Sequence, residues 1–139
     1  MEGIIIRRLA LLFVISILLS GCFGDGDKID FRIHNSTDEE EKNAEGIFMD
    51  DNRLTDVVAI FNKKDLIAGV SVKTFQRFKK AKIEKELKDD LEKVYPELDI
   101  VVSADSKIVM EIKKILEMKD KKDIGEKVKK LKSLVKEET

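Results

Sequence analysis

The chain has 139 residues, 40% of them charged, and its 27 basic and 28 acidic residues leave a net charge of −1. This balance argues against a nucleic acid as partner, because proteins that bind nucleic acid usually carry a basic excess. The single cysteine excludes a disulfide within the chain, and the single histidine excludes a metal site built from two histidines of one chain.

The first 21 residues have the layout of a secretory signal peptide. Arg7 and Arg8 form a short basic region, and an almost unbroken apolar run follows at Leu9–Leu19. Small residues then precede the only cysteine. The run is short for a transmembrane helix, so we expect residues 1–21 to act as a signal that is removed during export.

The sequence Leu19-Ser20-Gly21-Cys22 resembles the lipobox of bacterial lipoproteins. The resemblance implies that the Cys22 thiol receives a diacylglyceryl group, that the peptide bond before Cys22 is cut, and that Cys22 becomes the new N-terminus. It also implies that membrane lipid holds the mature protein at the outer face of the cytoplasmic membrane. We expect no cofactor other than this covalent lipid.

Residues 22–35 are expected to form the lipidated N-terminus, a spacer and a first strand. The Gly-rich stretch Phe23–Asp27 suits a flexible spacer. Apolar residues then alternate with polar ones from Ile29 to His34, which is typical of a half-buried strand. Ser36-Thr37-Asp38-Glu39 has capping-box spacing and predicts a helix at about residues 37–49, inside a single domain over residues 36–139.

The middle of the chain predicts a hairpin and then a helix. Two apolar, β-branched runs, Val57–Phe61 and Leu66–Val72, flank a polar turn and suit strands in the middle of a sheet. The period then changes, and an amphipathic helix is expected at about residues 79–94, ended by Pro96. Its apolar face would consist of Ile83, Leu87, Leu91 and Val94.

The last third predicts a strand at Leu98–Ser103 and two helices, the first capped by Asp105. The complete order is β-α-β-β-α-β followed by two helices, which indicates the α+β class. This order matches the split βαβ, ferredoxin-like arrangement, in which helices cover one face of a small antiparallel sheet. Without the weakly marked first strand and helix the order would be ββαβα, and the class would be the same.

No residue pattern in the chain supports catalysis. We interpret His34 as a solvated histidine at the end of a strand. The sequence contains no HExxH motif and no Gly-rich phosphate loop. Ser103 and Ser106 flank a helix N-terminus but have no evident base to activate them. We therefore expect a protein that is not an enzyme.

Three short stretches are candidates for ion sites. The carboxylates Asp25, Asp27 and Asp30 lack the glycine and the glutamate of an EF-hand loop, and Asp50-Asp51-Asn52 is more typical of a turn than of a weak cation site. The amides after Val101-Val102-Ser103 could hold an anion, but we expect Asp105 to cap them instead. No metal site is predicted.

The C-terminal helix is the most suggestive surface in the sequence. Its lysines surround an apolar stripe, so the helix could lie on anionic lipid near the tether. The alternative is that the stripe completes the core and leaves a solvated basic face. The candidates for membrane-surface contact are Lys127, Lys129, Lys130, Lys132 and Lys136.

Residues 44–136 are similar to the sporulation lipoproteins of the YhcN/YlaJ type. The likeness is clearest at Tyr95–Asp105, where a proline-containing turn precedes a strand ending in Val-Ser-Ala-Asp, and the apolar runs at Val57–Phe61 and Ala68–Val72 resemble the family's hairpin. The resemblance implies an envelope or spore-membrane location and a link to spore assembly or germination. It supplies no catalytic residues.

Two functions from different classes are therefore expected. The first is a non-catalytic lipoprotein of the spore or cell envelope that acts as an interaction module at the membrane, with a protein partner that the sequence does not name. The alternative is a small ligand-binding or sensor lipoprotein serving an envelope transporter or receptor, which would require a sizeable apolar pocket. An envelope hydrolase is disfavoured, since no nucleophile and base are paired.

Overall fold

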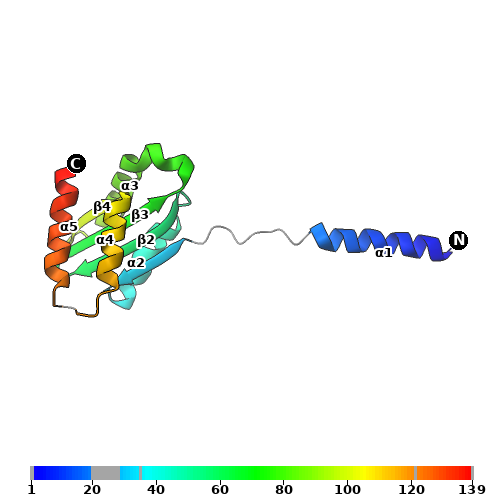
Figure 1. Cartoon of the computed structure of the whole chain (residues 1–139), viewed down its shortest axis with the longest axis horizontal. Coiled ribbons are helices and arrows are strands. Elements are labelled where there is room, and N and C mark those ends of the chain that lie inside the picture. The colour runs from blue at the N-terminus through cyan, green and yellow to red at the C-terminus, as the bar shows by residue number, and fades with distance from the viewer. Residues whose placement is uncertain (1, 20–28, 35, 121, 139) are drawn as a thin grey trace.

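The computed structural model describes residues 2–19, 29–34, 36–120 and 122–138. Its first helix, α1 (Glu2–Leu19), precedes an α+β domain (Figure 1). Among the side chains that the structure describes, none from α1 belongs to either hydrophobic core of that domain. None of the helices in the described part of the chain has both the length and the apolar character needed to cross a membrane.

The domain contains one four-stranded sheet, five helices and the expected order of elements. In chain order these are β1 (Asp30–His34), α2 (Asp38–Met49), β2 (Leu54–Asn62), β3 (Asp65–Val72), the 3-10 helix η1 (Thr74–Lys79), α3 (Lys80–Val94), β4 (Asp99–Ser103), α4 (Ser106–Leu116) and α5 (Ile124–Glu138). The α+β class is therefore confirmed. Because β1 pairs with β2, the folded unit begins near Ile29 rather than at residue 36.

The pairing of the strands differs from the expected antiparallel, ferredoxin-like sheet. The strands lie in the order β1-β2-β3-β4, with β1 parallel to β2, β2 antiparallel to β3, and β3 parallel to β4. The ferredoxin-like order would place β1 at an inner position, and because helices cover both faces of this sheet, β1 would then be buried on both faces. Asp30, Arg32 and His34 instead make one face of β1 polar. This strand fits an edge, and β2, which is apolar on both faces, takes an inner position.

The two crossovers, through α2 and α3, have opposite hands. Both helices pack on the same face of the sheet, and both connections step in the same direction across it. The pair β1/β2 runs antiparallel to the pair β3/β4, however. One of the crossovers must therefore be left-handed, an arrangement that parallel strand connections rarely adopt.

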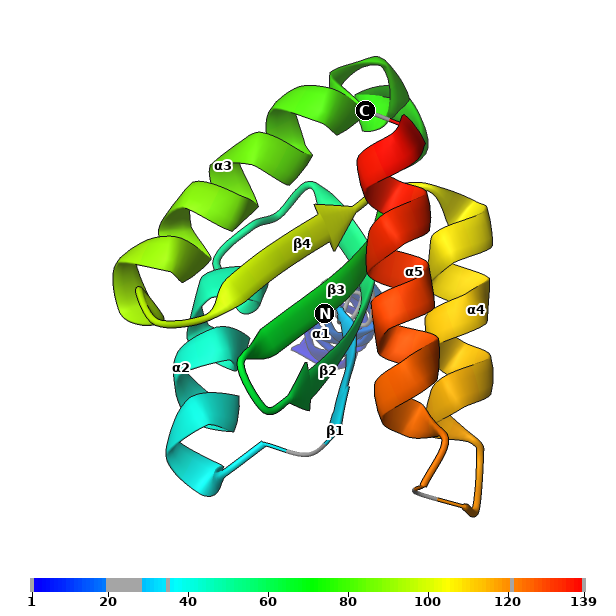
Figure 2. The same cartoon turned by 90° about the vertical axis from the view of Figure 1, so that its left-hand side faces the viewer.

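Helices cover both faces of the sheet rather than one (Figure 2). On the first face, α2 and α3 bury one set of alternating strand residues, including Val57, Ala59 and Ala68. On the second face, α4 and α5 bury the other set, including Ile60 and Ile67. Both faces of β2 and β3 are apolar, so a second pair of helices is needed to keep the sheet from water.

The ends of the helices are close to those predicted. The capping box of α2 joins Thr37 and Glu40, one residue later than the expected pair, with Thr37 Oγ1 accepting from the Glu40 amide at 3.2 Å. The amphipathic helix begins at Lys80, and Val94 is largely exposed. Tyr95 takes the predicted place of Val94 in the core, because the chain turns there and directs the ring against Phe61, 5.5 Å away between centroids.

Candidate functional site

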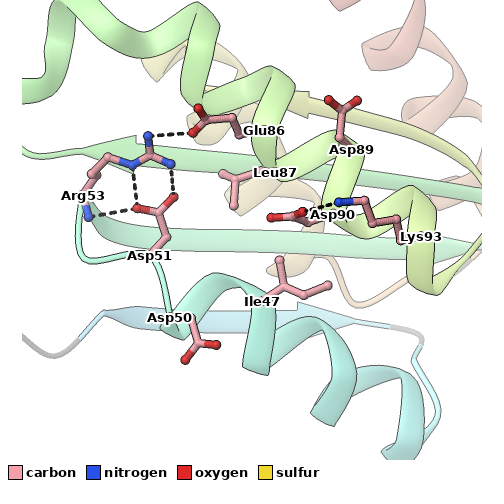
Figure 3. Close-up of a pocket in the computed structure, with 9 residues that line it drawn as sticks. All are labelled: Ile47, Asp50, Asp51, Arg53, Glu86, Leu87, Asp89, Asp90 and Lys93. Carbon is pink, nitrogen blue, oxygen red and sulfur yellow. Dashed lines mark hydrogen bonds and ion pairs between the residues drawn. The ribbon is translucent and has the colours of Figure 1, made fainter.

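A cleft of about 450 Å³ lies between the C-terminal end of α2 and the side of α3 (Figure 3). Its carboxylates outnumber its basic groups, so an unpaired cleft of this composition would attract cations. The lining residues are Ile47, Asp50, Asp51, Arg53, Glu86, Leu87, Asp89, Asp90 and Lys93.

Arg53 neutralises the inner part of this cleft. Its Nε and Nη2 atoms donate to the two carboxylate oxygens of Asp51 at 2.8 and 2.7 Å, and Nη1 lies 2.8 Å from Glu86 Oε2. The hydrogen bonds from Arg53 hold the pKa of Asp51 below its ordinary value, while those to Asp51 and Glu86 raise the pKa of Arg53. The two-pronged contact to Asp51 fixes the orientation of the guanidinium within the loop before β2, and the single contact to Glu86 joins this loop to α3.

The remaining acids of the cleft do not converge on one point. Figure 3 shows the carboxylates of Asp50 and Asp89 directed away from the arginine network, and Asp90 pairs with Lys93 at 3.2 Å. Within the described residues there is no group of three or more histidine, cysteine or acidic side chains that could hold a metal ion. The cation interpretation of Asp50-Asp51-Asn52 gains no support, since Asp51 is held by Arg53. The arrangement is that of a structural clamp.

The junction between β4 and α4 uses its amides for internal contacts. Asp105 caps α4, with its Oδ1 accepting from the Lys107 amide at 2.7 Å, as predicted. The amide of Ala104 donates to Glu84 Oε1 at 2.6 Å, and the amide of Asp105 donates to Ser103 Oγ at 3.2 Å. Carboxylates of the protein itself therefore occupy the place where an anion would bind, and capping is the correct interpretation.

The basic C-terminal helix does not present all its lysines to solvent. The residue Lys132 is only 8% exposed, and its Nζ donates to Asp65 Oδ1 and Asp99 Oδ2, each at 2.5 Å. Burial by itself lowers the pKa of Lys132, but the two hydrogen bonds outweigh burial and raise it overall. The same contact lowers the pKa of Asp99. The prediction that Lys132 contacts the membrane is therefore wrong. Its side chain lies between α5 and the sheet and joins this helix to the starts of β3 and β4.

The other four candidate lysines of α5 lie at the surface. Lys136 reaches Asp99 at 3.4 Å, and Lys127 Nζ donates to the Met118 sulfur at 3.1 Å. Both Lys129 and Lys130 are exposed. The apolar stripe of α5 is buried against the sheet, as the alternative prediction required.

A groove of about 390 Å³ runs between α4 and α5 and is the most apolar hollow near the tail helix. Ile115, Leu131 and Leu134 contribute its apolar floor. The polar groups on its rim are partly engaged with one another, as in the 2.9 Å contact between Lys114 and Glu111. A ligand pocket needs a few polar groups that converge on a bound molecule, and this groove offers none beyond its rim.

A surface that the sequence interpretation passed over lies directly after β3. We call residues 73–80 the basic–aromatic segment; it comprises η1 with the residue on either side. The side chains of Phe75 and Phe78 are 86% and 81% exposed, more than any other large hydrophobic residue described in the domain. The missed signal is the sequence Lys-Thr-Phe-Gln-Arg-Phe-Lys-Lys, in which two aromatic residues alternate with cations and have no apolar neighbours to complete a core face.

The residues of the predicted lipid anchor are placed only in part. Leu19 is the last residue of α1, while Ser20, Gly21 and Cys22 lie outside the described residues, as do Asp25 and Asp27. His34 ends β1, as expected, and is partly exposed. Asp30 pairs with Arg32 at 3.1 Å on the exposed face of β1.

Comparison of this chain with protein-family models, with curated proteins and with solved structures finds no match.

Proposed function

We propose that this chain is a non-catalytic lipoprotein of the spore or cell envelope, held at a membrane by a diacylglyceryl group on Cys22. The observation that carries the proposal is the apolar run that ends in Leu19-Ser20-Gly21-Cys22. The Cys22 sulfur would displace the headgroup phosphate from the glycerol carbon of a membrane phospholipid, so that a C–S bond replaces a C–O bond, the phosphate-bearing headgroup leaves and the thiol proton is lost. Hydrolysis of the peptide bond before Cys22 would then release the signal. The folded unit begins near Ile29, so the domain does not need the signal to complete its core.

The geometry of the domain supports an interaction module rather than an enzyme. The carboxylates of the cleft between α2 and α3 are directed apart or paired with Arg53 and Lys93. Near α4, Ser103 Oγ accepts a hydrogen bond from the Asp105 amide, which suits a structural role at the start of the helix. We therefore propose that the anchored domain functions through contacts between its surface and other molecules at the membrane.

The anchor is tested by labelling cells with an alkyne fatty acid and comparing the wild-type chain with Cys22→Ser. The wild-type protein should carry the label, run at the size of the chain from residue 22, and leave membranes only with detergent. The variant should carry no label. The variant Ser133→Ala, which changes an exposed hydroxyl of α5, is the matched control and should behave as wild type. Labelling of Cys22→Ser at the wild-type level would contradict the proposal.

The link to sporulation is supported by the resemblance at Tyr95–Asp105. It is tested by an immunoblot of membrane fractions from growing cells beside sporulating cells and purified spores. We expect the signal in sporulating cells and spores. An equal signal in growing cells would contradict the sporulation part of the proposal and leave a general envelope lipoprotein.

A further inference from the structure

The two exposed phenylalanines of the basic–aromatic segment share one side of a short helix. A 3-10 helix has three residues per turn, so side chains three apart lie nearly above one another. Phe75 and Phe78 have this spacing in η1, and both rings are more than four-fifths exposed. Isolated exposed apolar residues are ordinary, but two adjacent rings this exposed are an apolar patch that water solvates poorly.

Cations surround this patch without a carboxylate among them. From Leu66 to Ile83 the sequence contains no acidic residue, while Lys73, Arg77, Lys79, Lys80 and Lys82 all fall within it. In the part of the chain that the structure describes, Arg77 and Lys80 make no ion pair. The ammonium of Lys79 lies 5.5 Å from the centroid of the Phe78 ring, so charge and aromatic surface are presented together.

The segment lies at the end of the sheet where the chain arrives from the predicted anchor. Asp30 at the start of β1 is in register with Asp56, which pairs with Ser71 near the end of β3. The basic–aromatic segment follows β3 directly, at the same end (Figure 1). A membrane that held residue 22 would therefore be tethered to the end of the domain that carries the basic–aromatic segment.

We propose that the basic–aromatic segment docks the domain onto an anionic membrane surface, with Phe75 and Phe78 inserted at the headgroup level. The inference rests on the proposed lipid anchor, which supplies the membrane. Phenylalanine on a basic background is the composition of segments that lie in the membrane interface. A stable protein complex is a poorer fit, because two phenylalanines supply roughly 300–500 Å² against roughly 800 Å² per partner in a standard interface.

A single tryptophan reports this docking, because the chain has none of its own. The mature protein carrying Phe75→Trp, isolated from membranes, is reconstituted by detergent dialysis into vesicles of phosphatidylcholine alone or of phosphatidylcholine with phosphatidylglycerol. Flotation of the protein with the vesicles reports the anchor, and tryptophan emission reports the docking. We expect a blue shift and quenching by brominated acyl chains in the phosphatidylglycerol vesicles, both lost at high salt.

Two further variants make the test specific. Met110→Trp places the probe on an accessible position of α4, 57% exposed, and should keep a water-like emission in both vesicles. Adding Arg77→Gln, Lys79→Gln and Lys80→Gln to Phe75→Trp should reduce the ratio of docked to undocked domain by about fivefold per charge removed. All these side chains lie at the surface, so folding should be unaffected.

The remaining outcomes would overturn the proposal. If the Phe75→Trp protein floats with both vesicles while its tryptophan keeps a water-like emission, the domain is anchored but not docked there. An equal blue shift in neutral and anionic vesicles would show that charge takes no part. A blue shift without lipid that grows with protein concentration would show that a second copy of the chain covers the patch. If the protein floats with neither kind of vesicle, the lipid anchor is contradicted. Docking can still be measured in that case from the tryptophan emission after the protein is added to preformed vesicles of the same two compositions.

Discussion

Replacing Lys132 with methionine removes the cation that joins α5 to the starts of β3 and β4. Methionine keeps the apolar stem, so the change isolates the charge. A hydrogen bond to a charged group contributes about 1.5–3 kcal/mol. The hydrogen bond to Asp65 should contribute most of this free energy, because the Asp65 side chain is only 19% exposed. The hydrogen bond to Asp99 should contribute much less, because the Asp99 side chain is 53% exposed and water screens the charge. We expect a loss of about 2–3 kcal/mol, or a fall in melting temperature of roughly 10–20 °C.

The pH dependence of this loss has a defined sign. Because the pKa of Asp99 is lowered in the folded state, its contribution is present above its ordinary value of 3.8 and disappears as the pH falls through the lower folded value. Because the pKa of Lys132 is raised, its contribution is present below 10.5 and disappears as the pH rises through the higher folded value. The difference between wild type and Lys132→Met should therefore be constant between about pH 5 and 9 and shrink beyond both limits.

Urea unfolding of both proteins across this pH range measures the difference. Lys129→Met is the matched control, since Lys129 is an exposed lysine of the same helix, and it should change the free energy of unfolding by less than about 0.5 kcal/mol. The reasoning is refuted if Lys132→Met is as stable as the control, or if its destabilisation persists unchanged at pH 2.

Two further predictions concern packing and capping. Gly69→Ala should lower the free energy of unfolding in urea by about 1–3 kcal/mol, because the added Cβ would lie 3.0 Å from Ile112 Cδ1 and 3.2 Å from Val109 Cα. Gly46→Ala should raise the free energy of unfolding by about 0.5–1 kcal/mol, because a Cβ on this residue of α2 would meet no atom within 4 Å. Equal effects at the two glycines would contradict the close approach of α4. Thr37→Ala should cost about 1 kcal/mol and Ser36→Ala almost nothing by thermal melting; the reverse order would place the capping box at Ser36.

The secondary structure could be predicted because its signals are local. Alternation marked β1, β-branched runs marked the hairpin, and a period of 3.6 marked α3 and α5, whose residues Ile83, Leu87, Leu91 and Val128 are buried. The strand order is a non-local choice, and the order of elements alone is compatible with more than one sheet. The polar face of β1, with Arg32 and His34, was the available signal that this strand belongs at an edge.

The contacts of the charged side chains could not be predicted from the sequence for a related reason. Lys132 follows Leu131 and lies four residues after Val128, so helical spacing places it beside the buried stripe of α5, where a charge must find a partner. Its partners, Asp65 and Asp99, are remote in the sequence, and only the folded sheet brings them together. Arg53 and Glu86 are likewise joined by the packing of α3 and not by any spacing. Phe75 and Phe78 were visible in the sequence, but their exposure was not.

The proposed anchor is tested by the intact mass of the protein isolated from membranes, with sequencing of its N-terminal peptide. We expect a chain that begins at Cys22 and carries the mass of a diacylglyceryl group on that residue. An unmodified cysteine, or a mature chain that begins at any other residue, would contradict it.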